Sequence, residues 1–205
     1  MKNILSHKEL CSSNYFVSGS GYVPTVLPYS ISSLLMLESL IRFSKTDIFV
    51  EVGIGYGSTS VFVNCETEVS WTICLDDISN FKKENFYTEL KEMKNLIFIP
   101  MDIGMGIKNI LKVFRKTLVN HKTLFLFNLS CCKNPFIACE IFKTMEYLNS
   151  DIIAIENVGS ESFNKTSGLD EILSDSFIPL DKSGEPLFKT VSDFPFNISF
   201  YMKKG

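Results

Sequence analysis

The chain has 205 residues, of which 45% are hydrophobic and 21% charged, with a formal net charge of −3. This length suits one globular domain, and a slightly acidic chain with no Lys/Arg run longer than a pair disfavours a protein that acts mainly on nucleic acid. No apolar run reaches the roughly 18 residues that cross a bilayer, and the N-terminus turns polar too early for a secretory signal, so we expect a soluble cytoplasmic protein.

Residues 1–27 show little periodicity and contain Gly19, Gly21 and Pro24. We predict an irregular N-terminal segment that can act as a lid or contact a partner. From Pro28 to Phe43 the apolar residues recur at helical spacing, and a proline suits the start of a helix. Residues 28–205 are predicted to form the single domain, because they contain no internal repeat, low-complexity tract or linker.

Short apolar runs follow at 47–52, 71–75, 96–99, 124–127 and 152–155. They are continuous rather than alternating, which is typical of parallel strands covered on both faces. Between them, residues 107–118 and 137–148 each place apolar side chains on one helical face, and Asn134-Pro135 offers a cap and a first-turn proline. This alternation predicts a parallel sheet with right-handed crossovers.

The C-terminal part departs from this rhythm. Residues 188–191 and 196–202 have the composition of strands, but only Ser192-Asp193-Phe194-Pro195 lies between them. A helical crossover needs a longer connection, so the final pair of strands should be antiparallel.

The six cysteines form no C-x-x-C pair, and neither histidine stands near a cysteine cluster. The spacing of a zinc site is therefore absent, and we expect no metal site. Adjacent Cys131 and Cys132 allow a redox pair or a nucleophile, but free thiols beside a strand end are the preferred interpretation.

The first apolar run leads into the loop Glu51-Val52-Gly53-Ile54-Gly55-Tyr56-Gly57, and Ser58-Thr59-Ser60 then begins a helix. Gly53, Gly55 and Gly57 let backbone N–H groups and a positive helix end approach a ligand closely. The dinucleotide fingerprint G-x-G-x-x-G needs a glycine where Ser58 stands, which disfavours a nicotinamide oxidoreductase. Tyr56 can line the pocket or lie on the surface.

In this loop, and in the order of its elements from about Pro28 to Tyr201, the sequence resembles the class I S-adenosylmethionine-dependent methyltransferases. Their first motif is an acidic residue followed by glycines at this spacing. The resemblance implies a three-layer, Rossmann-like α/β fold with a seven-stranded sheet in the order 3-2-1-4-5-7-6, mostly parallel with an antiparallel C-terminal strand. It also implies S-adenosyl-L-methionine as the cofactor.

Acidic residues stand at the strand ends where the resemblance places this cofactor. Glu51 would help to orient the methionine portion, or would instead bond to backbone N–H groups of its own loop. Asp76, or second Asp77, would accept the ribose hydroxyls, although Asp77 also suits a helix cap. Asp102 would meet the adenine amino group with Ile103 packed on the ring, or Asp102 would cap the next helix.

Two further residues follow the later strands. Asn128 stands where many small-molecule methyltransferases have an aspartate; an amide cannot act as a base and binds Mg²⁺ poorly, but it can hydrogen-bond to cofactor or substrate. Glu156 is the best-placed general base, unless it is a solvent-facing acid in a connecting loop. His121 precedes a strand, at the opposite edge of the sheet, and is not expected to be catalytic.

These features favour a metal-independent methyltransferase that acts on oxygen or nitrogen of a small molecule. Methyl transfer from a sulfonium mainly needs alignment of the acceptor, which fits a sequence without a conspicuous catalytic cluster. The alternative is a non-catalytic Rossmann-like protein that binds a nucleotide or a partner, and an oxidoreductase ranks third. We expect a small-molecule methyl acceptor, no membrane association, and a fold compatible with a homodimer.

Overall fold

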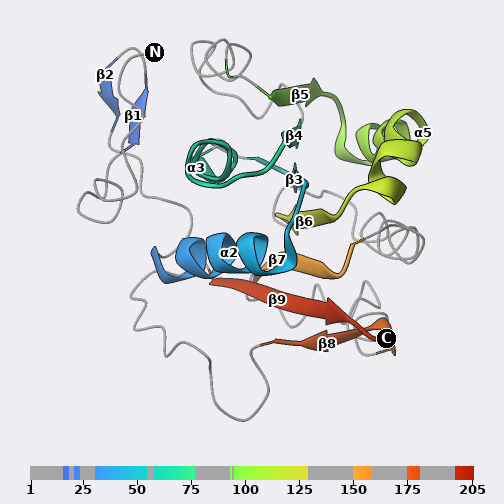
Figure 1. Cartoon of the computed structure of the whole chain (residues 1–205). Coiled ribbons are helices and arrows are strands. Elements are labelled where there is room, and N and C mark those ends of the chain that lie inside the picture. Colours follow the sequence, from blue (N-terminus) through green and yellow to red (C-terminus); the bar gives the residue numbers. More distant parts are fainter. Residues whose placement is uncertain are drawn as a thin grey trace.

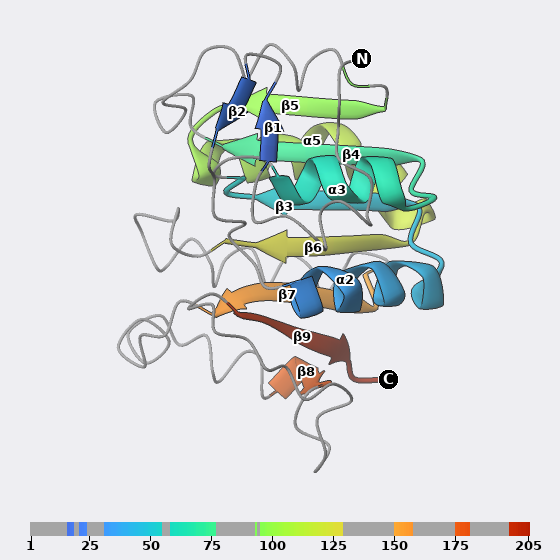
Figure 2. The same ribbon diagram turned by 90° about the vertical axis from the view of Figure 1, so that its left-hand side faces the viewer.

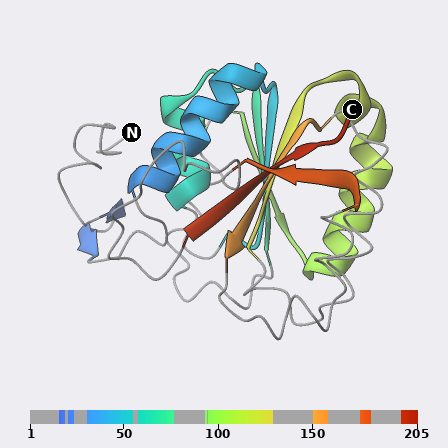
Figure 3. The same cartoon turned by 90° about the horizontal axis from the view of Figure 1, so that it is seen from below.

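The computed structural model describes residues 16–18, 21–23, 31–54, 58–76, 93, 95–128, 150–157, 175–180 and 197–205. A seven-stranded sheet runs through the molecule, with α2 and α3 on one face and α5 on the other (Figures 1 and 3). Its strands are β3 (Ile48–Val52), β4 (Trp71–Asp76), β5 (Leu96–Pro100), β6 (Thr123–Phe127), β7 (Ile152–Asn157), β8 (Phe177–Pro179) and β9 (Asn197–Lys203). The described helices are α2 (Ile31–Ser44), α3 (Ser58–Glu66) and α5 (Ile103–Asn120).

The order of strands across the seven-stranded sheet is β5-β4-β3-β6-β7-β9-β8. Strands β3 to β7 pair in parallel, whereas β9 is antiparallel to both β7 and β8. Numbered along the chain within this sheet, the order is 3-2-1-4-5-7-6. The predicted fold class is therefore confirmed.

The sixth strand of the sheet lies elsewhere than predicted. It is β8, at Phe177–Pro179, and its Ile178 pairs with Met202 of β9. The run 188–191 that was expected to form this strand lies outside the described residues. The antiparallel direction of the last strand is confirmed, but residues 180–196 join β8 to β9, so the short connection from 188–191 that suggested this direction stays untested. A three-residue edge strand is too short to produce a hydrophobic pattern.

The helices agree with the periodicity where the structure describes them. The helix expected over 28–43 is α2, and the one expected over 107–118 is α5, which begins earlier, at Ile103. The helix expected over 137–148 lies outside the described residues. Within the N-terminal segment predicted to be irregular, β1 (Phe16–Ser18) and β2 (Gly21–Val23) form a short antiparallel pair that is separate from the main sheet and lies on its α3 side (Figure 1).

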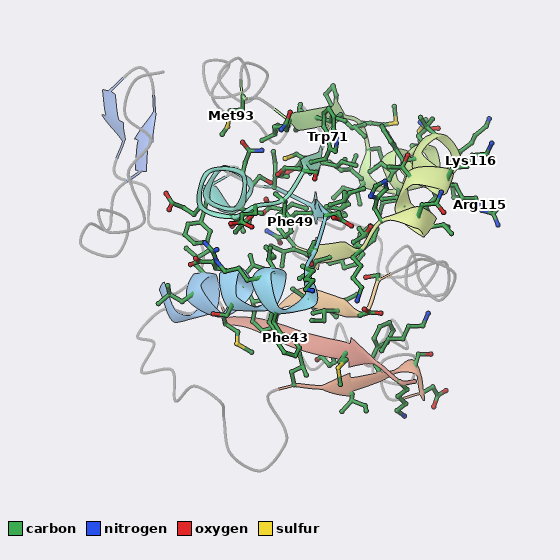
Figure 4. All side chains as sticks on the ribbon, in the orientation of Figure 1. Phe43, Phe49, Trp71, Met93, Arg115 and Lys116 are labelled. Carbon is green, nitrogen blue, oxygen red and sulfur yellow. The ribbon has the colours of Figure 1, made fainter. Side chains whose placement is uncertain are left out.

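Two hydrophobic layers hold the helices against the sheet. Every residue of β3 is buried, because alternate side chains enter opposite layers. Val50 and Val52 face α5, where they join Ile103 and neighbouring residues of that helix. Phe49 faces α2 and α3 (Figure 4) and packs with their apolar side chains. None of the helices in the described part of the chain is long and apolar enough to span a membrane.

Candidate functional site

Parallel pairing brings the carboxyl ends of β3, β4, β5, β6 and β7 to one edge of the sheet, the side to which their arrowheads point in Figure 2. In open α/β sheets ligands bind outside this edge. The register sets Val52 beside Leu75 and beside Phe127. The residues that follow these three, Gly53, Asp76 and Asn128, therefore emerge next to one another.

Gly53 is the first residue of the glycine loop and has a left-handed backbone, with φ 81°. A side chain at this φ is strained, so the turn needs glycine. Its N–H donates to the Leu75 carbonyl at 2.8 Å, which ties the loop to the end of β4. Gly55, Tyr56 and Gly57 lie outside the described residues, and their contacts with a cofactor stay a prediction.

Glu51 lies within β3 and is almost fully buried, with 1% of its surface exposed. The hydroxyl of Ser60, in the first turn of α3, donates to Glu51 Oε2. The thiol of Cys74, on β4, donates in turn to Ser60 Oγ at 3.0 Å. Burial, and next the charge of Glu51, raise the pKa of the Cys74 thiol far above its ordinary value. Cys74 is thus a protonated hydrogen-bond donor.

Asp76 ends β4 and is completely buried. Its carbonyl accepts a hydrogen bond from the Met101 N–H at 3.0 Å, which holds the turn after β5 against the tip of β4. The backbone of Asp76 is therefore held in place by β4 itself and by the residue that follows β5. Asp77 lies outside the described residues.

Asp102 is the N-cap of α5, because its carboxylate accepts a hydrogen bond from the Met105 N–H at 3.2 Å. The capping interpretation is therefore confirmed. The neighbouring Ile103 is 5% exposed and packs in the layer between α5 and the sheet. Contact of Asp102 and Ile103 with adenine stays a prediction.

Asn128 follows β6 and is buried. Its N–H donates to the Val52 carbonyl at 2.8 Å, which continues the pairing between β6 and β3. Gly53 and Asn128 thus continue from neighbouring strands. Glu156 lies within β7, paired with Ile198 of β9, and not in a connecting loop. Its side chain is outside what the structure describes.

The opposite edge of the sheet has a different character. His121 Nδ1 lies 3.7 Å from Asp47 Oδ2, just before β6, as expected for a histidine away from the site. Among the residues that the structure describes, no group of three His, Cys, Asp or Glu side chains is placed to hold a metal ion. Cys131 and Cys132 are not among those residues.

Sequence reasoning missed Ser60 and Cys74 as parts of this site. Ser60 was expected only to help begin a helix, and Cys74 was one of several unassigned thiols. The register explains their meeting, because Glu51 pairs directly with Cys74 across β3 and β4, so both side chains face α3. A polar residue inside each of two buried strands is the signal that could have indicated this contact.

No protein-family model matches the sequence, and no curated relative does either. The structure is similar to that of an rRNA methylase from Streptococcus thermophilus, with a TM-score of 0.56 and 13% identity over 84% of this chain and 97% of that one. A putative methyltransferase from Thermobifida fusca YX gives 0.58 and 12%, over 85% and 80%. A precorrin-6y C5,15-methyltransferase from Geobacter metallireducens GS-15 gives 0.52 and 13%, over 85% and 90%. At such identities the likeness shows the fold alone, a Rossmann-like α/β fold shared with these methyltransferase structures.

Proposed function

We propose that the protein is an S-adenosylmethionine-dependent methyltransferase that transfers a methyl group to oxygen or nitrogen of a small molecule, without a metal ion. The observation that carries this proposal is the turn after β3. There the buried acid Glu51 precedes a glycine with an obligatory left-handed backbone, Gly53, beside the buried Asp76. Two carboxylates at the edge where open α/β sheets bind their ligands support a polar ligand there.

The chemistry of the residues around this turn supports the cofactor. Gly53 turns the backbone sharply after β3, and Gly55 and Gly57 would let backbone N–H groups and the start of α3 approach the cofactor closely. Asp76 would accept the paired ribose hydroxyls, and Glu51 would meet the amino group of the methionine portion. Asp102 and Ile103 lie beyond the neighbouring strand, on the side where the adenine would extend.

The sulfonium of the bound cofactor would supply the activated methyl group. The protein's own task is to hold an acceptor lone pair in line with that methyl carbon and to exclude water. A base is needed only where the acceptor must lose a proton, and Glu156, at the end of β7, is the proposed base. Asn128 offers an amide to the cofactor or the substrate, and its weakness as a Mg²⁺ ligand favours the metal-independent route.

Calorimetry tests the cofactor. S-adenosylmethionine, S-adenosylhomocysteine and NAD are titrated separately into the purified protein, and we expect heat from the two adenosyl ligands only. Asp76→Asn should weaken both by at least roughly tenfold, since a charge-assisted hydrogen bond is lost. Asp175→Asn, the same exchange at an exposed residue before β8, is the matched control. Absence of heat and of a thermal shift with both adenosyl ligands would refute the proposal.

Activity separates the enzyme from the non-catalytic alternative. A protein that only binds a nucleotide or a partner would bind S-adenosylmethionine without ever forming S-adenosylhomocysteine. Incubation with a mixture of small-molecule acceptors, followed by mass spectrometry, should detect S-adenosylhomocysteine and a product heavier by one methylene unit. Binding without any turnover over a broad set of acceptors would favour the alternative.

A second candidate acceptor is RNA, and one observation favours it. The exposed side of α5 carries Lys108, Lys112, Arg115 and Lys116, and this helix contains no acidic residue. Arg115 and Lys116 point away from the sheet (Figure 4). Composition did not reveal this stripe, because residues spaced by three and four meet only on a helix. One of the similar structures is an rRNA methylase.

Fluorescence anisotropy with a labelled single-stranded RNA discriminates between the two acceptors. Binding that weakens between about 50 mM and 200 mM salt, and that Lys112→Glu/Arg115→Glu abolishes, would support RNA. Lys45→Glu/Lys204→Glu changes the charge equally at exposed positions outside α5 and is the control. If the parent protein fails to bind RNA at the lower salt, the small-molecule acceptor is retained.

A further inference from the structure

We infer that Ser60 and Cys74 are positioning residues that orient the carboxylate of Glu51 toward the amino group of the adenosyl ligand. The inference rests on the proposed function, because it concerns how the same site recognises the amino-acid portion of its ligand. It adds two residues, on α3 and β4, that do not touch the ligand themselves but act through Glu51.

The geometry gives the chain of hydrogen bonds a single direction. Cys74 Sγ lies 3.0 Å from Ser60 Oγ and donates to it. A hydroxyl has one hydrogen, so Ser60 directs its own hydrogen to Glu51 Oε2. The Cys74 thiol on β4 thus donates to the Ser60 hydroxyl on α3, which donates to the Glu51 carboxylate. Reversal would require a protonated Glu51, because a carboxylate has no hydrogen to donate to Ser60.

Burial makes this arrangement rigid. Ser60 and Cys74 are fully buried, and Glu51 is exposed by only 1%. Water therefore cannot replace the Ser60 hydroxyl if it is removed, and the carboxylate would lose a donor at Oε2. Three elements supply the atoms, so a rotation of the carboxylate would break a contact between β3 and α3. Ser60 thus fixes the plane in which Glu51 presents its charge.

The side chains that flank Glu51 on β6, α3 and β4 determine which charges stand beside its carboxylate. Leu126, which pairs with Glu51 on the β6 side, is apolar, and Ser60 carries no charge. Cys74 is the titratable neighbour on β4, and its burial keeps it protonated, so it adds no negative charge next to the carboxylate. The hydrogen bond from Ser60 favours the ionised form of Glu51. An ionised carboxylate is what a ligand ammonium group requires.

Two ligands separate a positioning role from a structural one. S-adenosylhomocysteine has the amino-acid portion, and methylthioadenosine has the same adenosine and sulfur without it. Ser60→Ala should weaken the first by at least roughly tenfold and the second by less than about twofold, because only the first has an ammonium group for Glu51. Ser39→Ala, the same exchange at an exposed helical serine whose hydroxyl bonds to the Leu35 carbonyl, should change neither.

Cys74 supplies an independent pair of variants. Cys74→Ser keeps a donor to Ser60 and should preserve binding of S-adenosylhomocysteine within about twofold, whereas Cys74→Ala should weaken it by roughly threefold or more. This pair tests the inference even if Ser60→Ala fails to fold, which circular dichroism would show. Equal affinities for Cys74→Ser and Cys74→Ala would contradict a role for the thiol as a donor.

The pH profile gives a readout that a packing defect would not move. Removal of the Ser60 hydroxyl disfavours the ionised carboxylate, so the loss of S-adenosylhomocysteine affinity on acidification should begin at higher pH in Ser60→Ala than in the parent. An unchanged acid limb, or an equal loss of both ligands, would overturn the inference while leaving the proposed function intact. If the parent binds neither ligand, the proposed function itself fails.

Discussion

The contact between Gly106 of α5 and Leu75 of β4 allows a stability prediction with a calculable cause. A Cβ added at Gly106 would lie 2.1 Å from Leu75 Cδ1, 3.0 Å from its Cδ2 and 3.1 Å from its Cγ. Carbon atoms in favourable contact are about 3.5–4.0 Å apart, so Gly106→Ala requires a movement of more than about 1 Å. Leu75 is fully buried, so neither its side chain nor the helix can move freely.

Two opposing effects set the size of the change. Overpacking a well-filled core costs about 1–3 kcal/mol, and replacing glycine by alanine inside a helix contributes up to about 1 kcal/mol in the other direction. We therefore expect Gly106→Ala to lower the free energy of unfolding by about 1–2 kcal/mol. Urea denaturation, monitored by the helical circular-dichroism signal, measures this change in the free energy of unfolding.

A double-mutant cycle isolates the clash. Leu75→Ala alone should cost about 2–5 kcal/mol through the cavity that it leaves. Gly106→Ala added to Leu75→Ala should then stabilise the protein, because the new methyl group enters that space. If Gly106→Ala instead stabilises the parent protein by about 1 kcal/mol, as at an exposed helical site, the close approach of α5 to β4 is wrong.

Three further predictions concern single residues. Asp102→Ala should lower the free energy of unfolding by about 0.5–2 kcal/mol and Asp102→Ser by less, because serine can still accept the Met105 N–H; urea denaturation of both variants checks this. Burial raises the pKa of the Cys74 thiol in the folded protein above its ordinary value of 9.0. Above pH 9.0 the unfolded chain therefore loses this proton while the folded protein keeps it, so the free energy of unfolding should fall as the pH rises. Cys74→Val should show a smaller fall between about pH 8 and pH 10, and an identical fall would exclude Cys74 as a cause. Lys122→Ala should change stability by less than about 1 kcal/mol in the same assay, although its ammonium lies 2.6 Å from Asp151, because both side chains are about half exposed.

The fold could be predicted because its strands are buried on both faces. The five parallel strands appear as continuous apolar runs, and α5 appears as an apolar stripe whose start is marked by a capping aspartate, Asp102. The same logic fails for β8, which has three residues and, within the described part of the chain, pairs with β9 alone. Its short segment has neither the length nor the two covered faces that create a pattern.

The site could be predicted only where local sequence determines it. Gly53 is required by a local backbone angle, and the loop that contains it was therefore recognisable. The contact among Glu51, Ser60 and Cys74 depends on the register of two strands and on the placement of α3, and a shift of one residue would turn Cys74 to the other face. Such long-range geometry leaves no spacing signal in one sequence.

The charged side chains at the two edges of the sheet differ in their exposure to solvent. At the edge before β3 and β6, Asp47, Lys122 and Asp151 form hydrogen bonds and an ion pair near solvent, where charges are inexpensive to keep and add little stability. At the other edge Glu51 and Asp76 are exposed by 1% and 0%, where a carboxylate loses hydration. The Ser60 hydroxyl already donates to Glu51, and under the proposed function the two carboxylates would in addition meet the ammonium group and the ribose hydroxyls of the ligand.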